Sequence, residues 1–185
     1  IEAVDPRVIK SVNPDSFFTG ALATYRLDLA TSEYTSASGI TLTDAIANGL
    51  CPAFPDQVPQ PTLLVDGVAK TLSEWNTAVG AECAYPNPAG TVTPNVTVTS
   101  IAFTSADGSF DVEFAAASMP AQSTAVIQYT AMQRSAYIPD TPSAPRNGAT
   151  SSGDTMVNHV EVTGTTTAIP ALDTVESASG APAYG

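Results

Sequence analysis

Positive charge is scarce in this sequence of 185 residues, where six lysines and arginines stand against eighteen aspartates and glutamates and give a net charge of −12. A surface with so few cations offers no basic patch for nucleic acid or for an anionic membrane. Long apolar runs are also missing, and none approaches the roughly 20 residues needed to cross a bilayer. We therefore expect no nucleic-acid partner and no membrane insertion.

Histidine occurs once, as His159, and cysteine only twice. A Ser-His-Asp triad would have to use His159, and a zinc site would have to combine it with both cysteines, without the short spacing of zinc ligands. No glycine-rich phosphate loop is present. We expect no metal, no cofactor and no enzyme turning over a substrate. A secreted hydrolase is the minor alternative, although its many carboxylates fall at no recognisable spacing and His159 lies on the opposite strand face from Asn158.

Alternating apolar positions and 15 prolines are what the sequence does have, with charged residues at only 13%. Period-two alternation is typical of half-buried strands. Seven segments show it or read as strands, at residues 6–12, 21–30, 39–46, 95–104, 109–115, 123–133 and 155–166. The pattern predicts an all-β fold, a β-sandwich of about seven or more strands over residues 1–168. Residues 169–185 are rich in alanine, serine and glycine, and are expected to form a linker or C-terminal tail.

An insertion at residues 51–90 interrupts the strands and contains both cysteines. In an acidic protein with secreted character, Cys51 and Cys83 are expected to form a disulfide, with two buried free thiols as the alternative. The composition thus favours an extracellular location.

A short helix is expected within the insertion, over Thr71–Val79, with apolar residues at helical spacing behind Ser73 as a candidate cap. Trp75 and Tyr85 have two interpretations. They are candidate ligand contacts of an adhesin module, or Trp75 fills a small core of the insertion's own.

Three polar residues lie in phase with the apolar residues of their strands. Lys10 alternates with Val8 and Val12, while Asp44 and Asn158 alternate with apolar neighbours in the same way. Burying any one of them without a partner costs several kcal/mol. Each alone could be explained by a bulge, by a lysine reaching to solvent, by a turn or by a satisfied amide, but together they predict a meeting point inside the sandwich.

An amine, a carboxyl and a carboxamide in a dry core have a characteristic chemistry. Desolvation favours the neutral amine, which makes Lys10 a nucleophile. Asp44 as an acid could hydrogen-bond the carbonyl of Asn158 and shuttle a proton. Loss of ammonia would leave an isopeptide bond between Lys10 and Asn158, formed once and without turnover.

Five short motifs follow one another in a distinctive order along residues 4–168, outside the insertion. They are Val8-Ile9-Lys10-Ser11-Val12, then Thr24-Tyr25-Arg26-Leu27-Asp28-Leu29 after Gly20, Ile40-Thr41-Leu42-Thr43-Asp44 with Gly49-Leu50, Ala125-Val126-Ile127-Gln128-Tyr129-Thr130-Ala131, and Asn158-His159-Val160-Glu161-Val162. This order resembles the conserved repeat domain found in tandem in bacterial surface proteins, a relative of the collagen-adhesin-type immunoglobulin-like domains. Two departures are Ala47, where the family usually has proline, and the cysteine-bearing insertion.

The resemblance implies that the sandwich is immunoglobulin-like. It also implies a structural stalk or adhesin domain on the cell surface or cell wall of a bacterium. Its partners would be neighbouring domains of the same protein, and a host or cell-surface ligand if the insertion binds one. In cross-linked members the lysine is the nucleophile, the asparagine the electrophile and the aspartate the catalytic acid. Those roles would fall on Lys10, Asn158 and Asp44.

Overall fold

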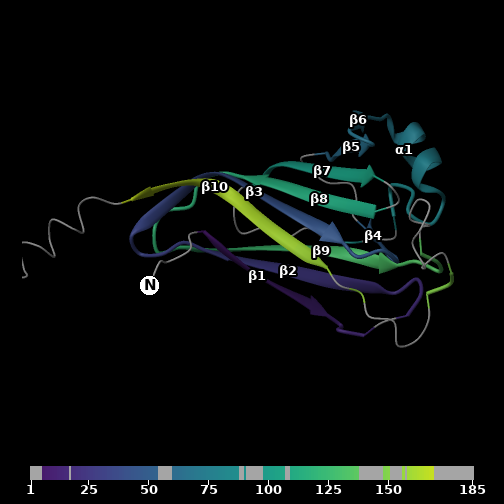
Figure 1. The fold of residues 1–185 in the computed structure, drawn as a ribbon, viewed down its shortest axis with the longest axis horizontal. Coiled ribbons are helices and arrows are strands. Elements are labelled where there is room, and N and C mark those ends of the chain that lie inside the picture. The colour runs from purple at the N-terminus through teal and green to yellow at the C-terminus, as the bar shows by residue number, and fades with distance from the viewer. Residues whose placement is uncertain are drawn as a thin grey trace, which may run out of the picture.

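The structure is a computed structural model, and the residues it describes are 6–16, 18–53, 60–87, 90, 98–106, 109–137, 148–150, 156 and 158–168. The expected tail at 169–185 and the expected strand residues 95–97 lie outside this part of the chain. Within the described residues the protein is an all-β sandwich of two sheets with one short helix, as the sequence predicts (Figure 1).

The smaller sheet has four strands, in the spatial order β1 (Arg7–Asn13), β2 (Leu22–Ala30), β9 (Thr124–Gln133) and β4 (Leu50–Ala53). The larger sheet has six, in the order β10 (His159–Ala168), β3 (Thr35–Ile46), β8 (Ser109–Ala116), β7 (Val98–Ala106), β5 (Thr62–Val65) and β6 (Val68–Ala69). All ladders are antiparallel except β5 with β7, which is parallel.

The core lies between the sheets because the inner strands alternate between buried and more exposed residues. In β2, every second residue from Ala23 to Leu29 is buried, and β8 buries its residues from Phe110 to Ala116 in the same rhythm. Since side chains of a strand point to opposite faces in turn, one face of each sheet supplies the core. Asp44 is the charged member of this buried set, in phase with Leu42 and Ile46 of β3.

The first and last strands of the sandwich lie on the edges of opposite sheets. β1 ends the smaller sheet, β10 ends the larger one, and the two strands contact each other across the interior. They belong to different sheets and therefore share no ladder of backbone hydrogen bonds. We call this line of contact between β1 and β10 the seam.

The insertion is part of the two sheets rather than an appendage. Its first residues form β4 beside β9, and β5 and β6 extend the larger sheet beyond β7, next to α1 (Leu72–Val79) (Figure 1). Trp75 of α1 is 1% exposed and packs against Phe103 and Phe110. The expectation that Trp75 fills a separate small core was therefore wrong, because its ring completes the main one.

The helix begins two residues earlier than a cap at Ser73 would place it. Its N-cap is Thr71, whose hydroxyl accepts a hydrogen bond from the Glu74 backbone amide while the Glu74 carboxylate accepts one from the Thr71 amide. This reciprocal capping box satisfies two backbone donors that a Ser73 cap would leave unpaired. The Thr71-x-x-Glu74 pattern is the signal that identifies it.

Candidate functional site

Lys10 points from β1 into the interior of the seam. Odd and even residues of β1 alternate in exposure, and Lys10 falls on the more buried side with Val8 and Val12. Its side chain is only 13% exposed and forms an ion pair with Oδ1 of Asp44 on the facing sheet. The same ammonium lies 3.4 Å from the Tyr129 hydroxyl and 4.6 Å from the centre of the Tyr25 ring.

Asp44 is fully enclosed and uses both carboxylate oxygens. Its side chain is 0% exposed, with Oδ1 facing Lys10 and Oδ2 accepting a 2.5 Å hydrogen bond from the Tyr129 hydroxyl. Two donors on one carboxylate offset much of the cost of burying it. Asp44 lies opposite Val160 of β10, which sets the register of the last strand at the seam.

Asn158 immediately precedes β10, two residues before Val160, so its side chain is directed to the same face of the chain as that valine. Its amide nitrogen and oxygen are buried, and neither has a hydrogen-bond partner among the described residues. The amide nevertheless lies beside the hydroxyls of Tyr25 and Tyr129, where it lowers the pKa of both phenols against the larger effect of burial. A buried amide without hydrogen-bond partners is rare in folded proteins, and each such group requires an explanation.

We call these five residues the seam cluster: Lys10, Tyr25, Asp44, Tyr129 and Asn158. Lys10 and Asn158 share Tyr25 and Tyr129 as neighbours, and Lys10 contacts Asp44 directly. The three residues singled out from strand phase are thus gathered around one point at the seam.

Burial sets the electrostatics of the cluster. It lowers the pKa of Lys10 below its usual 10.5, against the opposing effect of the Asp44 charge. Burial also raises the pKa of Tyr25, and it raises that of Tyr129 well above 10.0 with help from the negative charge of Asp44. Lys10 is therefore easier to deprotonate than a surface lysine, while Tyr129 stays a hydrogen-bond donor.

The two tyrosines were not assigned to the site from the sequence. Their rings stack with centroids 5.2 Å apart, in directly opposed positions of β2 and β9. Both lie on the apolar face of their strands, and a buried tyrosine hydroxyl requires a polar partner. That requirement, applied to Asp44 and Asn158, is the signal that would have found them.

The cysteines of the insertion form the expected disulfide. Cys51 and Cys83 are bonded, with their Cα atoms 5.9 Å apart and both side chains buried. The bond ties β4, at the edge of the smaller sheet, to the segment that follows α1. A structural disulfide of this kind is typical of a non-reducing compartment.

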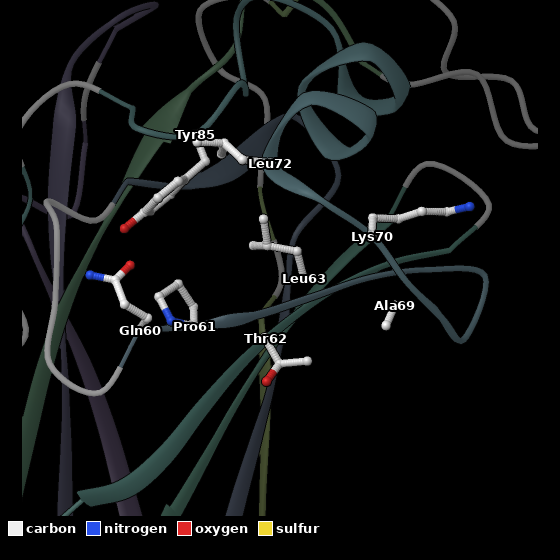
Figure 2. Close-up of a pocket in the computed structure, with 8 residues that line it drawn as sticks. All are labelled: Gln60, Pro61, Thr62, Leu63, Ala69, Lys70, Leu72 and Tyr85. Atoms are coloured by element: carbon white, nitrogen blue, oxygen red, sulfur yellow. The ribbon is translucent and has the colours of Figure 1, made fainter.

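Trp75 and Tyr85, the two aromatic candidates for ligand contact, lie in different environments. Trp75 is enclosed in the core, out of reach of a ligand, whereas Tyr85 lines a pocket of about 310 Å³ beside β5 and α1 (Figure 2). Apolar groups such as Leu63 and Leu72 form much of its wall, and the Lys70 side chain extends away from Tyr85. This volume is at the lower end of the ~300–1,000 Å³ typical of ligand sites, with few converging polar groups.

Other site types find little support in the part of the chain that the structure describes. His159 is exposed on β10, away from the buried face of the seam. Among the described residues no three His, Cys, Asp or Glu side chains gather in a way that could hold a metal ion. No helix there is long and apolar enough to span a membrane.

Comparison with known proteins leaves the seam cluster as the main guide to function. No protein-family model, no curated protein and no solved structure matches the chain.

Proposed function

We propose that this chain is a structural stalk or adhesin domain of an extracellular bacterial surface protein, stiffened by a self-formed isopeptide bond between Lys10 and Asn158. The observation that carries the proposal is the seam cluster: a buried ion pair of Lys10 with Asp44 beside a buried, unpartnered Asn158 amide. In an inert core, apolar residues of similar volume would serve as well or better. A one-time reaction gives these three polar groups a reason to be there.

The reaction begins with one proton passing from the Lys10 ammonium to Oδ1 of Asp44, which leaves a neutral amine and a neutral acid. The amine lone pair attacks Cγ of Asn158, and the carbonyl oxygen gains electron density while the Asp44 carboxyl donates a hydrogen bond to it. A proton from the amine then reaches the amide nitrogen through Asp44. The C–N bond of the carboxamide breaks, ammonia leaves, and Asp44 retains one proton.

The position of the bond explains what it would do for a stalk. It would join the edge strands β1 and β10, which no backbone ladder connects. Tension entering near one end of the domain would cross from Lys10 to Asn158, and the chain between them would be spared extension. The disulfide and the scarcity of positive charge fit the same extracellular setting.

Intact-mass measurement of the purified, folded protein tests the proposal. We expect a mass below that of the sequence by one ammonia in addition to the two hydrogens of the disulfide. Tryptic digestion should then release a branched peptide that links the segment around Lys10 to the segment containing Asn158. A folded, aged sample that keeps its full ammonia would overturn the proposal.

A further inference from the structure

Tyr129 donates a hydrogen bond to the carboxylate oxygen of Asp44 that Lys10 does not contact. Its hydroxyl lies 2.5 Å from Oδ2, while the Lys10 ammonium contacts Oδ1. The ring is held in place by stacking on Tyr25 and by contact with Phe114, whose centroid is 5.9 Å away. The hydroxyl is therefore aimed by packing and has little freedom to turn to another acceptor.

A phenol in this position can donate a hydrogen bond but does not give up its proton. Burial and the Asp44 charge both hold the pKa of Tyr129 far above 10.0. Oδ2 is then permanently an acceptor, so a proton arriving at the carboxyl is directed to Oδ1. Oδ1 is the oxygen that faces Lys10, where a proton shuttle must act.

We infer that Tyr129 is a positioning residue for the proposed cross-linking, fixing the Asp44 carboxyl and assigning its transferable proton to Oδ1. The inference rests on the proposed function and deepens it. Without the hydroxyl, the carboxylate could rotate, and either oxygen could carry the proton. Reaction would then require the correct rotamer and the correct oxygen at the same moment.

The acid–base behaviour of the cluster should change as well. The charged and titratable groups around Asp44 are Lys10 of β1, Tyr25 of β2, Tyr129 of β9 and Asp111 of β8, whose pKa is raised by burial and by Asp44. Removing the Tyr129 donor leaves the ionised carboxylate less well stabilised, so the pair should accept a second proton more readily. The acidic limb of the reaction's pH profile should therefore move to higher pH.

The test compares wild type with Tyr129→Phe, which keeps the ring, and with Tyr85→Phe, a matched loss of a phenol hydroxyl in the insertion. Each chain is made in a short pulse of oxidising cell-free synthesis, then held at a series of pH values. Aliquots are quenched in acidic denaturant and weighed for loss of ammonia. Circular dichroism and a cooperative unfolding transition verify that each variant is folded.

We expect Tyr129→Phe to react about 10- to 100-fold more slowly than wild type, the loss expected for one hydrogen bond to a charged group. Its acidic limb should lie at higher pH, while Tyr85→Phe should follow wild type in both respects. An equal rate, or a slower rate with an unmoved limb, would overturn the positioning role. A wild type that never loses ammonia would instead overturn the proposed function and this inference with it.

A second variant covers failure of Tyr129→Phe to fold. Tyr129→3-fluorotyrosine keeps the shape of the ring and makes the hydroxyl a stronger donor. The acidic limb should then move to lower pH. A limb in the wild-type position would contradict the inference.

Discussion

Removing the proposed bond by Asn158→Ala should destabilise the folded domain by an amount that loop length sets. Bonding Lys10 to Asn158 closes a ring of about 150 residues, and the chain-entropy model values such a closure at about 5 kcal/mol. For a domain of this size, 1 kcal/mol corresponds to roughly 2–4 °C in melting temperature. We therefore expect Asn158→Ala to melt about 10–20 °C below wild type, with Lys10 and Asp44 still paired.

Lys10→Met loses the same bond and also leaves Asp44 buried in the core without its ion-pair partner. Asp44 is 0% exposed, and the Tyr129 hydroxyl would remain as a hydrogen-bond donor to its carboxylate. Breaking a buried ion pair by removing one partner costs a further ~3–5 kcal/mol. The double variant Lys10→Met/Asp44→Leu should recover much of that second loss, since it leaves no unpaired charge.

Differential scanning calorimetry on the three variants and wild type measures both effects, with intact mass recording which samples are cross-linked. The order expected in melting temperature is wild type, then Asn158→Ala, then Lys10→Met. If cross-linked wild type and Asn158→Ala melted within a few degrees of each other, the loop-closure argument would be wrong. If Lys10→Met matched Asn158→Ala, the Lys10–Asp44 pair would have no energetic role.

Three further predictions concern the Cys51–Cys83 disulfide, the carboxyl group of Asp44 and the phenol of Tyr129. Alkylation of the unfolded protein without reductant should label neither Cys51 nor Cys83, and two labels would disprove the bond. Reduction should lower the free energy of unfolding by about 3–4 kcal/mol in a denaturant titration, because the bond closes a loop of 32 positions. Asp44→Ala should fold yet keep its ammonia by intact mass, and full cross-linking in that variant would assign the proton shuttle to another group. In a Lys10→Met background, stability should fall above about pH 10 by roughly 1.4 kcal/mol per pH unit, because the unfolded chain ionises Tyr129 there while the folded state keeps its proton. Tyr129→Phe should reduce that slope, and an unchanged slope would show that other groups cause it.

Strand phase was enough to predict the direction of the seam residues. Because alternate residues of a strand face opposite sides, the apolar neighbours of Lys10 and Asp44 already indicated that both side chains point inward, as the structure has them. The all-β sandwich and the Cys51–Cys83 disulfide follow from composition and spacing in the same way. Local sequence carries these features because local periodicity and compartment chemistry determine them.

Contacts between residues far apart in the sequence could not be predicted from strand phase or composition. Nothing near Leu50–Ala53 in the sequence shows that this segment completes the smaller sheet, nor that Trp75 reaches the main core. The same holds for the hydrogen bond of Tyr129 to Asp44, since 85 positions separate the two residues. Sequence alone indicated that each polar group needed a partner, but only the tertiary structure selects which.

The disulfide lies at one margin of the smaller sheet, at β4, and the proposed bond from Lys10 would lie at the opposite margin, at β1. Along the chain, the Cys51–Cys83 ring is nested inside the ring that Lys10 and Asn158 would close. A protease that cuts once anywhere between Lys10 and Asn158 would then release no fragment, because both pieces stay joined through the outer ring. Two cuts would be needed to free a peptide, and two cuts placed on either side of the disulfide-bonded loop would still leave that loop intact. The nested arrangement would thus let a domain on an exposed cell surface survive nicking that would divide an ordinary β-sandwich.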